Sequence, residues 1–579
     1  MMKNFSFKKL QSPDLLQKIR NNPHYTPLLN LLKENYTKYD FEVIPSLTYS
    51  MRMTHDRVGT REEFELPYFE RRYFLASCTI LALLYPENEV YLAKLQDMLW
   101  AILDEWSWAG CSHTRAEKFN AETFIDLFAA ETGLMLTEIS ILLQDRLEEL
   151  VLQRIQKEVK RRIVESYNSR RFWWEWATNN WTMVCTGNVA CILLYLYPEI
   201  FEQNKERIFF SVNNFLDAAP DDGTCLEGLD YWHYGFENFV WFADNYYIYT
   251  DKKVDLLNNK KVEKFAGYPN RILLKHNTFA SIADSLFDGK VDIGLNHFLI
   301  SRFPNGVTPL PSKTLTFRKG NVGWHELSKN LLYFNPDILP NNTEPQGDYY
   351  FQQAGQAVVN KEKYSLFAKA GHNDEPHNHN DVGSFILSTN CGQVFCDLGS
   401  GRYVDAYFQP TTRYETLCNS SLGHSLPIID NCVQKAGREF CGELTKADNI
   451  ISINFRQAYQ LENMDKLQRT FDCQDEHILL MDEFSSSYDV FVERFVTTIE
   501  PKLLDGFVLV GNVKLFYDKD CAVPTFSVTQ HIFHNGIPPH GQTPCPDMST
   551  TPKEIPVYLI DFKLKSNLTK ITFKLLVEK

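Results

Sequence analysis

The sequence predicts a two-part α+β chain with a helical first half and an all-β second half. Apolar residues recur at helical spacing in the first half, as at Ile139, Leu142, Leu143, Leu147, Leu150, Val151, Ile155 and Val159. After about residue 345, short segments rich in Val, Ile, Phe and Tyr alternate with turn residues. Between them lies NPDILPNNTEPQGD, rich in Pro, Asn and Asp. We therefore predict a helical domain over 1–340 and a β domain over 341–579.

The helical half contains further apolar segments of helical length. They include RRYFLASCTILALLY, VYLAKLQDMLWAILDEWSW, FIDLFAAETGLMLTEISILL and NVACILLYLY, and Pro or Gly punctuates several of the gaps. Many consecutive helices with short connections predict antiparallel pairs stacked in an arc or ring. No fixed-period repeat is present, so the sequence does not support a consensus solenoid.

The β half is a series of short predicted strands. Examples are SLFAKAGH, VGSFILST, GQVFCDLG, LQRTFDC, HILLMDEFSS, PVYLIDFKL and KITFKLLVEK. Such spacing is typical of packed antiparallel sheets.

Composition limits the class of protein. Apolar residues make up 44% and charged residues 23% of the 579 residues, as in soluble globular chains. The net charge of −14 argues against a large nucleic-acid footprint, although local basic clusters can still bind a polyanion. The 13 cysteines form no CxxC pair, and neither a signal-peptide core nor a membrane-length apolar run is visible. We expect a cytoplasmic protein with reduced thiols and no membrane or nucleic-acid partner. A trimmed secreted or periplasmic form is the alternative, and nothing predicts the oligomeric state.

The segment GHNDEPHNHNDVGSF begins the β half with an unusual density of polar groups. His377 and His379 alternate within it, while Asp397 lies in FCDLGSGRY and His424 in NSSLGHSLP. Two histidines and an aspartate suit a zinc or manganese site with N and O ligands. The alternative is a polar loop with unrelated residues.

Other clusters lie in the helical half. RRFWWEWATNNWTMVCTGN suits a sugar-binding wall with amide donors, although its Asn residues can also cap a helix. DDGTCLEGLDYWHYGFENF places Glu227, Tyr231 and Tyr234 near one another, and a Tyr can be structural or can carry protons. DEWSWAGCSH mixes aromatic residues with Glu105 and His113.

Together, HNHND, DLGSGRY, SSLGHS, NNW and EGLDYWHYG resemble the heparinase II/III family of polysaccharide lyases, which has certain alginate lyases and the dermatan sulfate epimerases as relatives. The resemblance covers most of the chain. It implies an incomplete (α/α) toroid followed by an antiparallel β-sandwich domain, with the active site between them. It also implies β-elimination at a uronic acid, in which a base removes the C5 proton and the bond from C4 to the bridging oxygen breaks.

The resemblance assigns roles to individual residues. Asn180 matches the group that neutralises the substrate carboxylate, and Asn179 is its alternative. Trp181 stands where several relatives have a His base, so we expect it to line the site instead. Tyr231 matches the catalytic tyrosine, with Tyr234 as second choice. His377 matches the partner base or charge neutraliser.

The remaining assignments concern a metal and the substrate. His379, Asp397 and His424 match the ligands of relatives that bind zinc, where the metal braces the β-domain loops; manganese or calcium is the alternative ion. The expected substrate contacts are Glu105, His113, Arg413 and Tyr414. One difficulty remains, because strict strand alternation would direct His377 and His379 to the same face. A β-bulge would separate them.

The leading hypothesis is a lyase that cleaves glycosaminoglycans or alginate. A uronate C5-epimerase on the same scaffold is the nearest alternative, since it begins with the same proton abstraction. A non-catalytic protein that binds anionic glycans is the third possibility.

Overall fold

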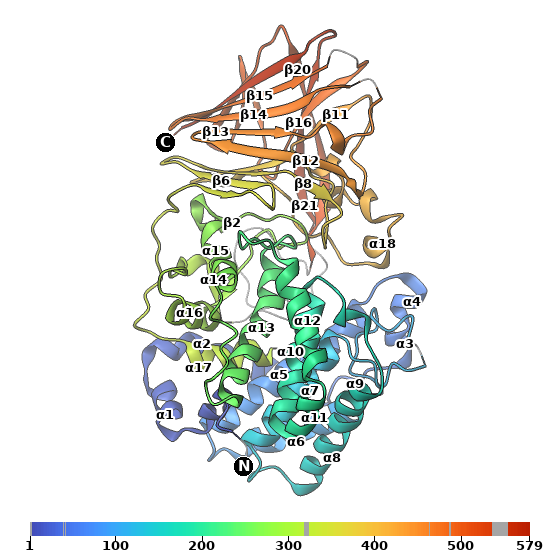
Figure 1. The fold of residues 1–579 in the computed structure, drawn as a ribbon, viewed down its shortest axis with the longest axis vertical. Coiled ribbons are helices and arrows are strands. Elements are labelled where there is room, and N and C mark those ends of the chain that lie inside the picture. Colours follow the sequence, from blue (N-terminus) through green and yellow to red (C-terminus); the bar gives the residue numbers. More distant parts are fainter. Residues whose placement is uncertain are drawn as a thin grey trace.

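The computed structural model describes residues 3–38, 40, 42–117, 119–317, 323–462, 464–485, 488–534 and 554–578. The molecule is elongated, with the helical half at one end and the β half at the other (Figure 1). The last helix of the first half ends at Tyr333 and the first strand of the second half begins at Tyr349, so the predicted boundary at 340 falls in the connection between them.

The helical half is built from many antiparallel helices. They are α1 (Pro13–Asn21), α2 (Thr26–Lys38), α3 (Tyr49–Arg52), α4 (Thr54–Val58), α5 (Glu62–Leu84), α6 (Glu89–Leu103), α7 (Leu127–Leu142), α8 (Glu149–Val159), α9 (Ser166–Ser169), α10 (Asn180–Leu196), α11 (Pro198–Gln203), α12 (Lys205–Ala218), α13 (Leu229–Tyr249), α14 (Lys260–Ala266), α15 (Tyr268–Arg271), α16 (Ile293–Arg302) and α17 (Trp324–Tyr333). Short strands β1 (Leu273–Leu274), β2 (Thr278–Phe279), β3 (Val291–Asp292) and β4 (Leu315–Thr316) interrupt the later part.

Helices α7 and α10 form the centre of this half. Every residue of α7 is buried, and α10 packs against α7, α12 and α13. Helix α5 packs against α2 and α6, and α17 returns to contact α5. This arrangement is the predicted incomplete (α/α) toroid.

The apolar stripe predicted over residues 139–159 is divided between two helices. Helix α7 ends at Leu142 and α8 begins at Glu149. In the connection, the Arg146 guanidinium donates to the backbone oxygens of Ala82 at 2.7 Å and Pro86 at 3.2 Å. These bonds fix a turn that the periodicity alone does not show, and Leu150 is left 60% exposed.

The β half contains three antiparallel sheets. The first, in the order β10-β9-β7-β6-β5, comprises β5 (Tyr349–Phe351), β6 (Gln356–Asn360), β7 (Ser365–Lys369), β9 (Phe385–Thr389) and β10 (Gly392–Phe395). The second, β11-β16-β21-β20, comprises β11 (Pro427–Ile429), β16 (Phe491–Thr497), β20 (Ala522–Ile532) and β21 (Glu554–Leu564). The third, β17-β18-β19-β22-β15-β14-β13-β12-β8, comprises β8 (Gly371–Asn373), β12 (Gly437–Ala447), β13 (Ile450–Asn454), β14 (Leu467–Cys473), β15 (His477–Phe484), β17 (Lys502–Leu504), β18 (Phe507–Val510), β19 (Val513–Phe516) and β22 (Lys570–Val577).

One apolar core joins the three sheets. Phe385 of the first sheet meets Phe471 of the third with ring centroids 5.2 Å apart. Phe495 of the second sheet meets Phe573 of the third at 5.1 Å. Alternating buried residues on β14 and β15 direct their apolar faces into this core, as period-2 patterning predicts. The predicted α+β class with packed antiparallel sheets is confirmed.

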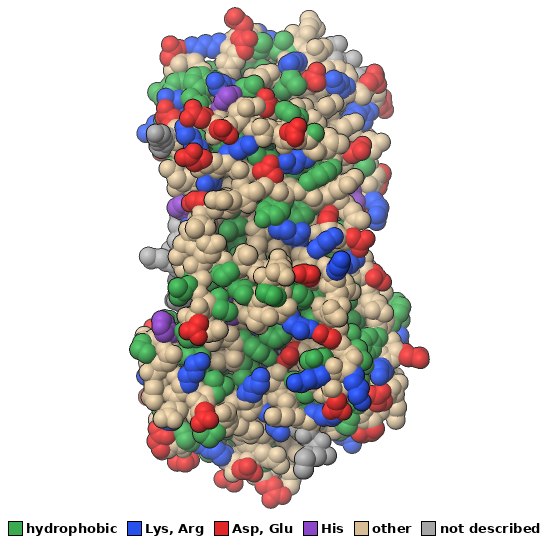
Figure 2. All heavy atoms as spheres, turned by 60° about the vertical axis from the view of Figure 1, so that its left-hand side comes forward, with side chains coloured by type: hydrophobic (Ala, Val, Ile, Leu, Met, Phe, Trp, Pro, Cys, Tyr) green, Lys and Arg blue, Asp and Glu red, His purple; other side chains and the backbone are tan. Residues whose placement is uncertain are grey.

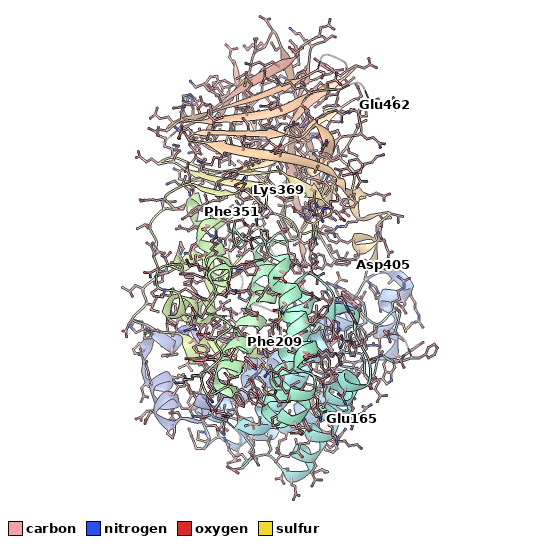
Figure 3. The ribbon with its side chains drawn as sticks, in the orientation of Figure 1. Glu165, Phe209, Phe351, Lys369, Asp405 and Glu462 are labelled. Carbon is pink, nitrogen blue, oxygen red and sulfur yellow. The ribbon has the colours of Figure 1, made fainter. Side chains whose placement is uncertain are left out.

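Contacts also cross the junction between the halves. The short helix α18 (Asp405–Phe408) lies near the arm formed by α3 and α4 (Figure 1). Asp405, labelled at the junction in Figure 3, donates its backbone N–H to Gly59 O at 2.8 Å, and its carboxylate meets Arg115 at 3.0 Å. Acidic and basic side chains are interspersed on the face shown in Figure 2. None of the helices in the described part of the chain has the length and apolarity to cross a membrane.

Candidate active site

The start of helix α10 separates the roles of the two neighbouring asparagines. Asn179 is the N-cap, and its side-chain oxygen accepts from the backbone N–H of Trp181 at 3.1 Å. Asn180 is 1% exposed, and neither atom of its amide group has a hydrogen-bond partner among the described residues. A buried polar group without a partner costs about 1–3 kcal/mol. The Asn180 amide therefore has no partner among the described residues, whereas the Asn179 side chain caps the helix.

The start of helix α13 positions Tyr231 and Tyr234 one turn apart. Gly228 precedes the helix with φ 86°, and a Cβ there would lie 2.1 Å from Ser285 Oγ, so only glycine allows this close approach. The Tyr234 hydroxyl donates to Glu131 Oε2 at 2.8 Å, inside the helical half. The Tyr231 hydroxyl lies 2.6 Å from the hydroxyl of Tyr403, which belongs to the β half. Tyr231 is therefore the tyrosine at the junction.

His377 lies in the loop between β8 and β9. Its φ of 58° is in the left-handed region, so the predicted strand, with or without a bulge, is wrong at this position. The imidazole stacks on the Tyr231 ring, with centroids 3.7 Å apart and planes at 15°. Its Nε2 lies 3.8 Å from Glu227 Oε2. Glu227 Oε1 in turn accepts the Asn180 backbone N–H at 3.0 Å. Asn180, Tyr231, His377 and Glu227 thus form one cluster.

Burial tunes the acidity of this cluster. Burial, opposed by the hydrogen bond from the Asn180 backbone N–H and reinforced by the nearby Asp284 carboxylate, raises the pKa of Glu227 to about 8. Burial also raises the pKa of the Tyr231 phenol. At neutral pH, Glu227 holds a proton and adds no negative charge beside Asn180.

Asp284 was not predicted, and it connects this cluster to the histidine pair. It lies between β2 and β3, and its Oδ2 accepts from His377 Nδ1 at 2.8 Å and from the Arg413 guanidinium at 3.1 Å. Its Oδ1 meets His379 Nε2 at 3.0 Å and also accepts from the Tyr407 hydroxyl. Burial alone would raise the pKa of Asp284, but Arg413 and the two imidazoles hold it well below its ordinary value. Asp284 is therefore a buried anion that fixes both histidines.

The predicted metal ligands lie together on the far side of Asp284. His379 Nδ1 lies 4.0 Å and His424 Nδ1 lies 3.4 Å from the Asp397 carboxylate, and all three residues are at most 3% exposed. One ligand atom from each lies within 4.8 Å of the others.

The hydrogen bonds of the two imidazoles suit metal binding. His379 donates through Nε2 to Asp284, and His424 donates through Nε2 to Cys418 O at 2.8 Å. The Nδ1 atoms of both rings are left buried without hydrogen-bond partners among the described residues. Outer hydrogen bonds that fix the tautomer in this way are typical of metal-bound histidines. The residues present therefore fit a divalent cation.

A second group, His233, Glu237 and Asp292, meets the same distance criterion inside the helical half. There, His233 Nε2 already accepts from the Asp292 backbone N–H at 3.3 Å. We assign no ion to it.

The residues predicted to contact substrate lie in different parts of the structure. Trp181 is partly exposed, and its ring meets those of His113 and Trp173 with centroids 4.8 Å apart in each case. These three rings form an aromatic wall beside Asn180. His113 is fixed by the Asp126 carboxylate, 2.7 Å from its Nδ1.

Arg413 and Tyr414 support the loop that carries His377. The Arg413 guanidinium donates to Asn378 O at 2.9 Å, and the Tyr414 hydroxyl accepts from the Asn378 amide at 3.4 Å. Glu105 lies elsewhere: it is buried in the helical half and pairs with Arg71 at 3.0 Å and Arg72 at 2.8 Å. These ion pairs give Glu105 a structural role instead of the predicted substrate contact.

A cavity of about 270 Å³ adjoins the cluster between the two halves. Glu227 and Tyr231 line it from the helical side, and His372, Glu375 and Arg438 line it from the β side. The cavity therefore reaches Glu227 and Tyr231, while Asn180 and His377 are not among the residues that line it.

The sequence and the structure were compared with those of known proteins. Residues 343–486 match the family model described as "Heparinase II/III-like, C-terminal". No curated protein sequence matches the chain.

Several solved structures share the fold over nearly the whole chain. A heparinase III structure aligns with TM-score 0.57 and 12% identity, covering 100% of this chain and 92% of that one. Heparan sulfate lyase from Pedobacter heparinus aligns with TM-score 0.54 and 11% identity, covering 99% and 92%. A chondroitin AC lyase from Streptomyces coelicolor A3 aligns with TM-score 0.54 and 9% identity, covering 99% and 82%. The expected resemblance is thus confirmed: residues 343–486 match the heparinase II/III-like C-terminal model, and the chain shares the fold of heparinase III and other polysaccharide lyases.

Proposed function

We propose that this protein is a polysaccharide lyase that cleaves uronic-acid-containing anionic glycans by β-elimination. The family domain and the shared fold support this class of enzyme. The observation that carries the proposal is the buried, unpartnered amide of Asn180 beside the stacked pair Tyr231–His377.

The Asn180 amide can lower the main energy barrier of this reaction, which is removal of the C5 proton. The C5 proton of a uronate is very weakly acidic, because its loss adds negative charge next to a carboxylate. A preorganised donor at that carboxylate stabilises the developing charge and is worth several kcal/mol, about 10²–10³ in rate. Asn180 lies at the positive end of helix α10, which adds to the effect. The protonated Glu227 next to it avoids repelling the substrate.

Tyr231 and His377 are suited to the proton transfers. The Tyr231 oxygen takes the C5 proton, the C4–O bond breaks, and a C4=C5 double bond forms. The same phenol, or the His377 imidazole stacked on it, returns a proton to the departing bridging oxygen. Positioned proton donors and acceptors contribute about 10²–10⁴ in rate.

We assign a structural metal to His379, Asp397 and His424. Two imidazole nitrogens and one carboxylate are ligands that zinc prefers. When bound, the ion would neutralise Asp397 and hold the loop in which His379 follows His377 by two residues. No proton transfer in the proposed reaction needs it.

The wall of His113, Trp181 and Trp173 supports a glycan as the ligand. Aromatic rings suit the apolar faces of sugars, and Trp173 extends the wall outward, since its side chain is 53% exposed. The neighbouring structures include lyases named for heparan sulfate and chondroitin, so we propose a glycosaminoglycan as the substrate class, with alginate as the alternative.

The test is a panel of hyaluronan, chondroitin, dermatan, heparan and alginate oligosaccharides. A lyase raises the ultraviolet absorbance of a C4=C5-unsaturated uronate steadily with time. Exchange of solvent deuterium into C5 without that absorbance would identify an epimerase instead. Binding without either signal would leave a glycan-binding protein and overturn the proposal.

A further inference from the structure

The hydroxyl of Tyr231 is held by a second tyrosine from the opposite half of the molecule. Tyr403, in the segment between β10 and α18, places its hydroxyl 2.6 Å from that of Tyr231. Tyr403 is 7% exposed, and its ring stacks on His534 with centroids 3.6 Å apart. The Arg61 guanidinium lies 5.1 Å from the same ring. A buried phenol packed on both sides cannot easily turn away from Tyr231.

We propose that Tyr403 is a positioning residue that donates its O–H to the Tyr231 oxygen and thereby holds Tyr231 as the base of the proposed elimination. The inference rests on the proposed function. Tyr403 is the last residue of the DLGSGRY motif, in which only Asp397 has a role expected from the sequence.

Each of the two hydroxyls has one proton, so one of them must donate to the other. The charged and titratable groups around Tyr231 are Glu227, Asp284, His377 and Arg61. Burial raises the pKa of Tyr231, and the charges of Asp284 and Glu227 raise it further, while the hydrogen bond with Tyr403 and the charge of Arg61 lower it. Glu227 contributes little negative charge at neutral pH, since its pKa is about 8.

The surroundings of Tyr403 favour its remaining protonated. Burial raises the pKa of Tyr403, and Asp284, Tyr231 and Tyr407 raise it further. Desolvation of the partly exposed His534 and the nearby charge of Arg61 lower its pKa to about 3, so it adds no positive charge at neutral pH. A tyrosine that acts as a base has no proton to donate, so in the state in which Tyr231 accepts the C5 proton the hydroxyl of Tyr403, 2.6 Å away, is the donor of the bond between them.

The proton balance follows from this direction. In the deprotonated form that reacts, Tyr231 is a phenolate that accepts the Tyr403 O–H. It takes the C5 proton as the C5–H bond breaks, and the electron pair forms the C4=C5 bond while the C4–O bond breaks. Tyr231, now a phenol, gives the proton to the bridging oxygen and returns to its starting state. Tyr403 keeps its own proton throughout.

The test is the pH profile of kcat/KM for Tyr403→Phe. Loss of the donor should move the acid limb to higher pH by about one to two units, which is a loss of about ten- to a hundredfold on that limb. Tyr350→Phe is the matched control, because the Tyr350 hydroxyl donates to Leu444 O at 2.9 Å within the β half. Its profile should match the wild type.

A second variant covers the case in which Tyr403→Phe does not fold. Replacing Tyr403 by 3-fluorotyrosine preserves the shape and strengthens the donor, so the acid limb should move to lower pH. An unmoved limb in either folded variant would overturn the inference while leaving the lyase proposal in place. Absence of unsaturated product with the wild-type enzyme would instead overturn the proposed function itself.

Discussion

The two halves of the molecule position their site residues by different means. The helical half supplies Asn180 and Tyr231 from the first turns of α10 and α13, two helices that pack directly on each other. The β half supplies His377 from an irregular loop with left-handed backbone. Helix geometry therefore fixes the first two residues, while side-chain bonds must fix the third.

Those side-chain bonds converge on Asp284, which comes from the helical half. It holds His377, His379, Arg413 and Tyr407 at once, and each of these belongs to the β half. Substitutions at the helix starts, at Asn180 or Tyr231, can therefore remove chemistry while leaving the geometry intact. Substitutions in the network around Asp284 should damage both together.

The largest expected effect is that of Tyr231→Phe. The variant keeps the helix and the stack on His377 but removes the proton acceptor, so kcat should fall by about 10²–10⁴. Glycan binding and thermal stability should stay near wild type. Calorimetry with an intact oligosaccharide and circular dichroism check these two points. If Tyr231→Phe lost glycan binding and folding together with turnover, the prediction that a substitution at a helix start removes only the chemistry would be wrong.

Asp284→Asn should reduce activity and stability together. An amide can replace only one carboxylate oxygen as an acceptor, so either His377 or His379 loses its partner, and the Arg413 charge is left unpaired. Breaking a buried ion pair costs about 3–5 kcal/mol, and we expect kcat to fall roughly tenfold to a hundredfold through misplacement of His377. Denaturant unfolding and steady-state kinetics measure the two effects.

Asp482→Asn is the matched control for Asp284→Asn. Asp482 is a buried aspartate paired with Arg469 at 2.7 Å inside the β half. Its substitution should cost similar stability, while the folded enzyme should retain its kcat. Equal losses of kcat in the two variants would show that Asp284 has no special connection to the site.

Local sequence features predicted the helical side of the site better than the β side. The pair Asn179–Asn180 before an apolar run indicates a helix start, and the structure assigns the cap to Asn179 and leaves the Asn180 amide without a partner among the described residues. Tyr231 and Tyr234 are both at the start of α13, and only tertiary contacts tell them apart, since one hydroxyl faces Glu131 and the other Tyr403.

The β side depends on contacts between distant residues. Asp284 lies 93 residues before His377 and 129 before Arg413, and its segment SIADSLFDG has the composition of an ordinary turn. Strand alternation does not describe His377 and His379, because the loop there is not a strand. Glu105 was selected from a polar and aromatic motif, which cannot reveal its pairing with Arg71 and Arg72.

Metal removal should affect stability more than chemistry. Chelation is expected to lower the Tm by about 5 °C or more, because a ligand that binds only the folded state stabilises it by mass action. The kcat of enzyme that stays folded should change little. His424→Ala should show the same lowered Tm, and chelator should shift it no further. A chelator effect that persists in this variant would place the relevant ion elsewhere, and loss of kcat at unchanged Tm would give the metal a chemical role.

The smallest expected effect is that of Trp173→Ala, which tests the outer end of the aromatic wall. Trp173 touches Trp181 but not the proton-transfer cluster, so the variant should raise KM for long oligosaccharides and leave kcat unchanged. A ring contact is worth about 0.5–1.5 kcal/mol, or roughly a twofold to tenfold change in KM. The matched control is Trp100→Ala, since Trp100 is 39% exposed on α6 and packs under Arg154. Because Trp173 lies beyond Trp181, the effect should disappear with the shortest substrate that is still cleaved. If KM rose equally for short and long substrates, Trp173 would contact the sugar unit that is cleaved, which is the same unit that Asn180 is proposed to bind.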